Sequence, residues 1–215
     1  MCIRDRYTGE EERVYVVTLS SELSGSYNSA QLGKDLWIEE HDGEAKRIYV
    51  FNSRSASVGE TLIACKIKEC EDQRMPFDDV VSTVENYIDR QNTYFVLENL
   101  DTLRKNGRLT GIKSLVASAL NIKPVMGSTP QGTICQLGQA RGIKRALAKM
   151  VEQIVEDAKD TGNKILAIAH CNCPERAKEV ERMIRDKIRV KDSFIVDTAG
   201  ISTMYANDGG IIVVL

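Results

Sequence analysis

Apolar and polar residues along the first part of the chain follow the pattern of strands that alternate with helices. Residues of β-branched and aromatic type predict buried strands over 13–20 and 47–51. Helices are predicted over 24–39 and 57–73, and a third begins at Phe77, where apolar residues recur at i, i+3, i+4, i+7, i+10 and i+11. Strands that are joined by crossover helices predict a parallel sheet.

Beyond about residue 92 the pattern changes, because a hairpin now follows. Strands over 123–128 and 133–138 are joined by Thr129–Gly132, whose Pro and Gly suit a tight turn between antiparallel strands. The hairpin predicts a mixed or antiparallel second sheet. The other predicted elements are strands over 93–97, 165–170, 194–197 and 211–215, helices over 100–105, 112–120, 143–160 and 174–187, and a turn over 205–210.

This order of elements predicts an α/β protein with two α/β domains. The N-terminal domain, residues 1–91, has the parallel sheet, and the C-terminal domain, residues 92–215, has the mixed sheet. The boundary lies near Asn92 without a flexible linker, because no spacer rich in Gly, Ser or Pro occurs there. Met1–Arg6 shows no periodicity and resembles an artefactual leader, so we expect the N-terminal domain to be incomplete.

Composition narrows the class of protein. Hydrophobic residues make up 42% and charged residues 28% of the chain, as in ordinary globular proteins. A net charge of -2 gives no basic field for nucleic acid. No apolar run approaches the roughly 20 residues that a membrane helix needs. We therefore expect a cytoplasmic protein without stable membrane insertion, and we expect its six scattered cysteines to be reduced thiols.

The polar stretch over residues 20–30 follows the first predicted strand. Ser24 is the natural N-cap of the next helix, so the N–H groups of Gly25, Ser26 and Tyr27 would point outward at the positive end of the helix dipole. Such a turn can receive a carboxylate or phosphate, although many such turns only cap a helix. The hydroxyls here are those of Ser20, Ser21, Ser24 and Ser26, more than one cap needs. The second predicted strand also ends in hydroxyls, at residues 52–57.

Cations gather after the predicted helix over 100–105. Arg104, Lys105 and Arg108 either complete a solvated helix C-terminus with Gly107 at C′, or form a docking edge for an anionic partner. Arg141, after the hairpin, forms either a surface ion pair or a cation that points into the cleft between the domains.

The sequence contains no recognisable metal site or catalytic constellation. His170, Cys171 and Cys173 have metal-ligand side chains, but the Cys-x-Cys spacing is better explained as a strand end that caps a helix at Pro174. Neither a Gly-x-Ser-x-Gly elbow nor a Gly-x-Gly-x-x-Gly or Walker loop occurs. We therefore expect no metal, no cofactor and no chemistry by the chain itself.

Five segments occur together in a characteristic order: Ser20–Ala30, Asn52–Gly59, Leu100–Arg108, Asn121–Val125 and Arg141-Gly142. In this order they resemble the DegV family of bacterial fatty-acid-binding proteins, over about residues 14–215. The resemblance implies two α/β domains that enclose one long-chain fatty acid. It also implies a separate ATP-dependent fatty acid kinase, which converts the presented carboxylate to an acyl phosphate.

The resemblance assigns roles to residues near the turn. It implies that Ser24 binds the carboxylate, in a site that comprises Ser21, Ser24, Gly25, Ser26, Arg141 and Tyr205. The family's second carboxylate ligand, a threonine in a Thr-Ser-Gln-Pro segment, has no counterpart upstream of Ser24. Tyr205 stands where many members carry a histidine. Because a phenol donates a hydrogen bond but accepts protons poorly at neutral pH, this difference concerns kinase coupling more than lipid binding.

Two other functions are also compatible with the sequence. An α/β enzyme could bind a phosphorylated or keto-sugar substrate at the same turn, and a regulatory module could hold a vestigial pocket. A carrier needs a long apolar tunnel, lined by residues such as Leu115, Val116 and Ile122, whereas a sugar enzyme needs a short polar pocket.

Overall fold

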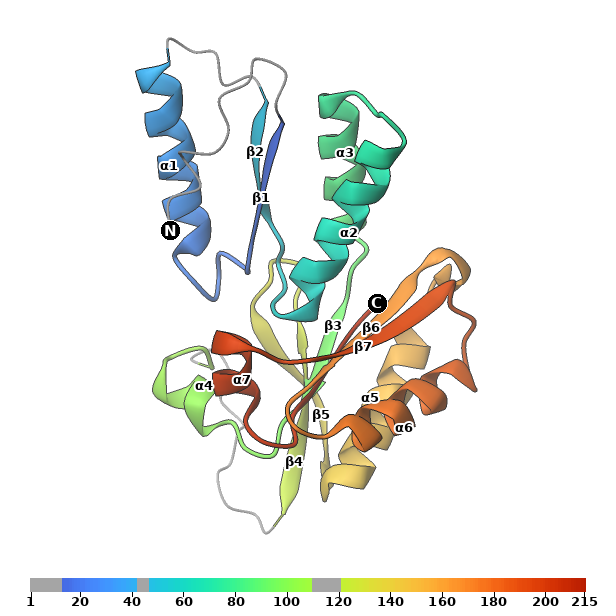
Figure 1. The fold of residues 1–215 in the computed structure, drawn as a ribbon. Helices are drawn as coiled ribbons and strands as arrows, with labels where there is room; N and C mark the ends of the chain where they lie inside the picture. Colours follow the sequence, from blue (N-terminus) through green and yellow to red (C-terminus); the bar gives the residue numbers. More distant parts are fainter. Residues whose placement is uncertain (1–12, 42–46, 110–120) are drawn as a thin grey trace.

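A small parallel sheet forms the first part of the chain. The computed structural model describes residues 13–41, 47–109 and 121–215. β1 (Val14–Thr18) pairs in parallel with β2 (Ile48–Asn52), and α1 (Ser26–Glu40) lies between them in sequence. Figure 1 shows the two strands between α1 on one side and α2 (Val58–Asp72) and α3 (Phe77–Ile88) on the other. The predicted parallel sheet is confirmed.

A larger mixed sheet forms the second part, in the order β5-β4-β3-β8-β6-β7. Its strands are β3 (Thr93–Val96), β4 (Ile122–Ser128), β5 (Ile134–Arg141), β6 (Ile165–His170), β7 (Asp192–Asp197) and β8 (Ile211–Val214). β6 and β7 pair in parallel, and the other neighbours are antiparallel. The predicted hairpin and the predicted mixed sheet are therefore confirmed.

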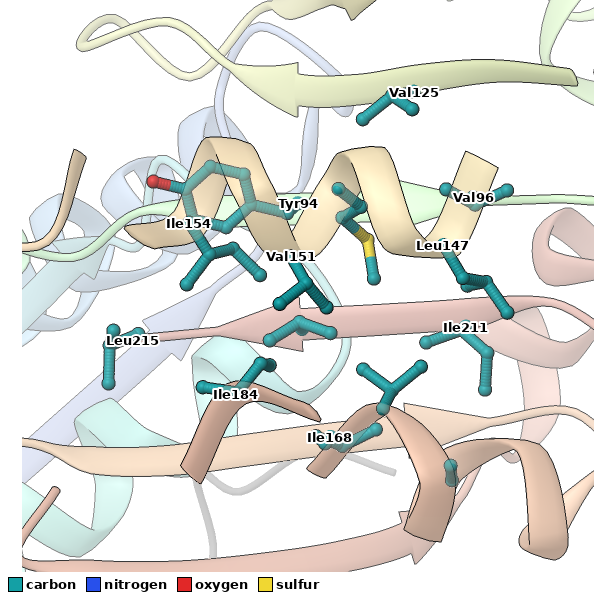
Figure 2. Packing of buried hydrophobic residues seen from close by; sticks show 14 of the residues in the cluster. Tyr94, Val96, Val125, Leu147, Val151, Ile154, Ile168, Ile184, Ile211 and Leu215 are labelled. Carbon is teal, nitrogen blue, oxygen red and sulfur yellow. The ribbon is translucent and has the colours of Figure 1, made fainter. Parts of the chain in front are cut away.

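One face of the mixed sheet packs against α5 (Ile143–Asp157) and α6 (Pro174–Arg185). Figure 2 shows Leu147, Val151 and Ile154 of α5 pointing toward the strands. Strand residues in the same cluster include Ile168 and Ile211, which are fully buried. The apolar stripe of α5 thus forms the larger hydrophobic core.

The opposite face of the mixed sheet packs against α2. Val58 and Leu62 of α2 share a buried cluster with Ala167, Ala169 and Val214, which alternate along their strands with the residues that face α5 and α6. Another face of α2 points away from this sheet. Residues Ile63, Ile67 and Cys70 pack instead with Phe51 of β2 and with α3. A single helix therefore contributes to the cores of both parts.

The predicted boundary between residues 91 and 92 stays a prediction. It falls just before β3, where Asn92 exchanges two backbone hydrogen bonds with Leu215, of 2.8 and 3.1 Å.

Other elements differ in detail from the predictions. α4 (Asp101–Lys105) is confirmed, and the predicted helix over 112–120 lies outside the described residues. α7 (Gly200–Ala206) was not predicted, and the turn predicted from residue 205 begins only after this helix. Its seven residues are too few to show helical periodicity. None of the helices in the described ranges is long and apolar enough to span a membrane.

The contact of α2 with the mixed sheet predicts a large effect for Leu62→Ala. Leu62 is 1% exposed, so the truncation should lower the free energy of unfolding by about 2–5 kcal/mol through lost burial and a residual cavity. Chemical denaturation measures this change. The matched control, Leu32→Ala on α1, removes a side chain that is 60% exposed and should change the free energy by no more than about 0.5 kcal/mol. Equal effects of the two variants would contradict the shared role of α2.

Candidate ligand-binding site

A cavity lies where the ends of the parallel sheet meet the mixed sheet. Its empty volume is about 870 Å³, part of which is open to solvent. The segments after β1 and β2 line it from one side. The mixed sheet, α4 and α7 line it from the others.

Most of the cavity wall is apolar. Phe95 and Leu97 lie on one face of β3 and its extension, with Ile212 on the neighbouring strand β8. Leu103 of α4 and Ile134 of β5 belong to the same buried or partly buried cluster. The wall can therefore bury a hydrocarbon chain, and burial contributes roughly 0.8 kcal/mol for each methylene.

A polar part of the wall comes from the segment after β2. Ser55 Oγ lies 2.6 Å from Thr93 Oγ1, so these two hydroxyls satisfy each other. The Ser57 N–H donates to Glu60 Oε1 at 3.1 Å. Burial raises the pKa of the Glu60 carboxyl, although the hydrogen bond from Ser57 lowers it in part. The sequence pointed to this segment through the hydroxyls after the second strand. Ser57 and Glu60 also have the Ser-x-x-Glu spacing of a capping box, and the structure forms this box at the start of α2. No signal in the sequence indicated that Thr93 would line the cavity.

Ser20 connects the turn after β1 to the mixed sheet. Its hydroxyl is fully buried and donates to the Gly132 carbonyl at 2.8 Å, and its N–H donates to the Ser55 carbonyl at 2.9 Å. Gly132 has φ +90°, and a Cβ there would lie 2.3 Å from Ser20 Oγ, so glycine is required at the hairpin tip. The tip and both strand-end turns are thus held together.

Ser21 pairs with Asn52 at the end of β2. The Ser21 N–H donates to Asn52 Oδ1 at 3.1 Å, and Asn52 Nδ2 donates to Ser21 Oγ at 2.8 Å. Ser21, which was predicted as a ligand-binding residue, is thus engaged by the neighbouring turn and is not among the residues that line the cavity.

The start of α1 differs by one residue from the prediction. Gly25 is the N-cap and Ser26 the first helical residue, so the prediction of Ser24 as N-cap was wrong. Ser24 is drawn into the preceding turn because its N–H donates to the Ser20 carbonyl at 3.1 Å. Its hydroxyl accepts the Ser26 N–H at 3.2 Å, so this N–H does not point outward unpaired as predicted.

Ser26 keeps a free hydroxyl at the start of α1. Its Oγ is buried and has no hydrogen-bond partner among the described residues. A buried hydroxyl without a partner is unfavourable, so a ligand acceptor at this position would satisfy it. Together with the positive end of the α1 dipole, Ser26 gives this turn the properties of an anion receptor.

Arg108 connects α4 to the same turn. The helix ends with Asn106 as C-cap and Gly107 at φ 72°, and the N–H of Arg108 donates to the Leu103 carbonyl at 2.9 Å, which confirms the predicted C-terminus. Arg108 lines the cavity, and its Nε donates to the Leu23 carbonyl at 3.0 Å.

The other two predicted docking cations lie on the surface of α4. Arg104 forms an exposed ion pair with Asp101 at 2.9 Å, and Lys105 is exposed. All three cations are exposed to solvent, and of the three Arg108 also lines the cavity and contacts the turn before α1.

Of the two other predicted ligand-binding residues, Tyr205 lines the cavity and Arg141 does not. Tyr205 lies in α7, not in a loop, and lines the cavity beside Ile201 and Ser202. Arg141 is exposed at the end of β5 and pairs with Ile122, at the opposite end of the hairpin from its tip. At about 3.3 Å for each strand residue, Arg141 is far from the tip and does not reach the cavity wall.

The predicted tunnel residues do not contribute to the described wall. Ile122 does not line the cavity, and Leu115 and Val116 lie outside the described residues. The residue types and their spacing in the sequence predict no metal site. Within the described ranges, no group of three or more His, Cys, Asp or Glu side chains could hold a metal ion. Cys173 is the N-cap of α6 with Pro174 at its first position, as predicted.

The fold and the cavity define an α/β binding protein with an apolar pocket and a polar strand-to-helix turn at its side. Comparison with known families agrees with this class. The model of the family described as "Uncharacterised protein, DegV family COG1307" matches residues 2–214. The chain belongs to the DegV family, as its motifs indicated.

Relatives of known sequence and structure support this assignment. A DegV domain-containing protein of Streptococcus gordonii is 33% identical over 201 residues, which are 94% of this chain and 70% of the relative. A DegV family protein of Ruminococcus gnavus, whose structure was refined with vaccenic acid, is 70% identical with a TM-score of 0.91. The match covers 95% of this chain and 72% of that one.

A second solved structure is more distant. The Streptococcus pneumoniae Fatty Acid Kinase (Fak) B3 protein, loaded with linoleic acid, is 31% identical with a TM-score of 0.83. The match covers 94% of this chain and 70% of that one.

The bond between Ser20 and Gly132 predicts the effect of Ser20→Ala. The variant leaves the carbonyl of the buried Gly132 without this donor, which should lower the free energy of unfolding by about 1–3 kcal/mol. Denaturant titration measures the loss, and hydrogen exchange should show faster opening of the hairpin tip. Ser29→Ala, at an exposed position of α1, is the control and should change little. An unchanged stability of Ser20→Ala would show that this bond does not hold the turns together.

Proposed function

We propose that this protein binds one long-chain fatty acid in the cavity between its two sheets and presents the carboxylate to a separate ATP-dependent fatty acid kinase. One observation carries the proposal: a largely apolar cavity has Leu23 in its wall, and the hydroxyl-bearing start of α1 follows directly after this residue. The relative with 70% identity, whose structure contains vaccenic acid, supports the same ligand class.

Affinity and orientation come from different parts of the ligand. A dozen buried methylenes supply on the order of 10 kcal/mol before the cost of association. A hydrogen bond to a charged head group contributes about 1.5–3 kcal/mol. The apolar wall therefore sets the affinity, and the polar turn sets which end of the ligand lies at the opening.

We place the carboxylate at the start of α1, beside Ser24, Gly25 and Ser26. The unpartnered Ser26 hydroxyl and the helix dipole favour an anion there. Arg108, three residues after the end of α4, adds a positive charge near this turn, since its Nε donates to the Leu23 carbonyl. Tyr205 can donate a hydrogen bond from α7. Ser21 supports the turn through Asn52.

The kinase partner follows from the absence of reactive groups in the sequence and from the relative named as a fatty acid kinase B protein. The chain is a lipid-binding protein that carries a substrate. We place the docking surface on α4, where Arg104 and Lys105 are exposed next to Arg108 at the cavity. Because the kinase consumes ATP, we place the protein in the cytoplasm.

The cavity chemistry argues against the two alternatives. A phosphorylated or keto-sugar substrate needs a short polar pocket, whereas this wall is mainly apolar. A vestigial pocket would be expected to fill with side chains, because interiors pack densely.

Native mass spectrometry of the protein purified from bacteria tests fatty acid binding. We expect a bound mass that matches a long-chain fatty acid, because the apolar wall gains free energy from burying the chain. Delipidated protein should take up added oleic acid again. Protein that is empty as purified and does not bind added fatty acid would refute the carrier function.

Ser24→Ala tests the role of the turn. Loss of a hydrogen-bonding group at the head should reduce kinase-dependent acyl phosphate formation by about tenfold or more, because the carboxylate is no longer correctly oriented. The dissociation constant for oleic acid should change by no more than about threefold, because the tail dominates affinity. Rates with purified kinase and a binding titration measure both effects.

Two variants control this comparison. Ser29→Ala changes an exposed hydroxyl of the same helix and should affect neither quantity. Lys105→Ala should raise the kinase KM for the loaded protein and leave fatty acid affinity unchanged, if docking occurs on α4. Equal losses of affinity and phosphoryl transfer in Ser24→Ala would contradict the proposed division between tail and head.

A further inference from the structure

Glu60 places a carboxyl group in the wall of a cavity that is otherwise suited to hydrocarbon. It lies in the first turn of α2 and lines the cavity. Its Oε1 accepts the Ser57 N–H at 3.1 Å. Its Oε2 makes no hydrogen bond with a described residue, yet it is not sealed off, because it is absent from the fully buried unpartnered atoms. One carboxyl oxygen is therefore available to a molecule in the cavity.

The neighbouring polar groups do not satisfy this oxygen. The hydroxyls of Ser55 and Thr93 bond to each other at 2.6 Å. Arg54, which also lines the cavity, forms ion pairs with Asp89 at 2.8 Å and with Glu85 at 3.6 Å. In the described part of the chain, Glu60 has no ion-pair partner. No described residue donates to this oxygen, so a ligand or water can do so.

The chemistry of Glu60 also does not suit the proposed head-group position. A fatty acid carboxylate beside a second carboxylate would be repelled, since like charges at close range oppose each other. The start of α1 offers the donors that a carboxylate needs, whereas the wall at Glu60 offers an acceptor. In the proposed binding mode, Glu60 therefore faces the acyl chain of the fatty acid.

A plain acyl chain leaves the available oxygen of Glu60 without a donor. Burying a polar group without a hydrogen bond is unfavourable. Partial burial also disfavours the charged form of Glu60 and so raises the pKa of its carboxyl. A plain chain can still bind when a proton or a retained water satisfies the carboxyl. A hydroxyl on the chain would supply the missing donor directly. Sites built to bond a hydroxyl discriminate strongly against analogues that lack it.

We propose that Glu60 is a specificity-determining residue that accepts a hydrogen bond from a hydroxyl on the acyl chain. Long-chain fatty acids with one hydroxyl on the chain are then preferred over plain chains of equal length. This inference rests on the proposed function, because it concerns the chain of the same bound fatty acid.

A matched pair of ligands tests the selectivity. Ricinoleic acid and oleic acid have the same length and one double bond, and ricinoleic acid has an additional hydroxyl on the chain. Competition against a fluorescent fatty acid gives both dissociation constants. The native protein should bind ricinoleic acid about tenfold more tightly, which corresponds to about 1.4 kcal/mol. Stearic acid and a series of hydroxystearic acids with different hydroxyl positions provide a second comparison.

Glu60→Leu should abolish the preference, because leucine offers no acceptor, and it should bind oleic acid at least as tightly as the native protein. Glu60→Gln keeps an acceptor and should retain part of the preference. Glu69→Leu is the matched control, since Glu69 lies on the same helix, pairs with Lys66 at 3.0 Å and does not line the cavity. Thermal unfolding checks that each variant is folded.

The outcomes separate the two proposals. If the native protein binds neither acid, the proposed function fails. If it binds plain chains and prefers no hydroxylated acid of either series, only the selectivity fails. A preference that persists unchanged in Glu60→Leu would also overturn the role of Glu60.

Discussion

The burial of α2 against both sheets is the contact on which the rest of the structure depends. Val58 and Leu62 pack on the mixed sheet, and Ile63 and Ile67 pack toward β2 and α3. Ala167 of β6 lets the helix approach closely, because its side chain is small. Since one helix belongs to both cores, the two parts share its burial energy. Its first turn is thereby fixed at the junction, where Glu60 lines the cavity.

The cavity forms where the turns after β1 and β2 meet the hairpin tip and the mixed sheet. The mixed sheet uses one face for α5 and α6, so its other face is shared by α2 and by the cavity, as the alternation of Tyr94 and Phe95 along β3 shows. The turns after β1 and β2 close this face from above, as Figure 1 shows, and Ser20 bonds them to the hairpin tip at Gly132. This arrangement gives the cavity an apolar floor and polar turns beside it. A fatty acid is divided in the same way, into an apolar chain and a polar carboxylate.

The start of α1 shows how a local rule was modified by its surroundings. Serine after a strand is a natural N-cap, and the sequence therefore assigned this role to Ser24. The backbone of Ser24 bonds instead to Ser20, so the helix begins one residue later and Ser26 retains the unpartnered hydroxyl. A polar turn lies in the segment where the sequence predicted one, and its unpartnered donor is the Ser26 hydroxyl, whereas the sequence led us to expect free N–H groups.

The sequence by itself determined the types and order of the elements, the parallel and mixed sheets, the C-terminus of α4 at Gly107 and the polar turn at residues 20–26, because these depend on local periodicity and capping. Only the tertiary structure decided which residues share the cavity. Ser20 and Gly132 are 112 residues apart, and no local pattern links them. The same reason explains why Arg108 reaches the turn and Arg141 does not, and why Glu60 was missed: a side chain's neighbours across a cavity are set by how the sheets pack.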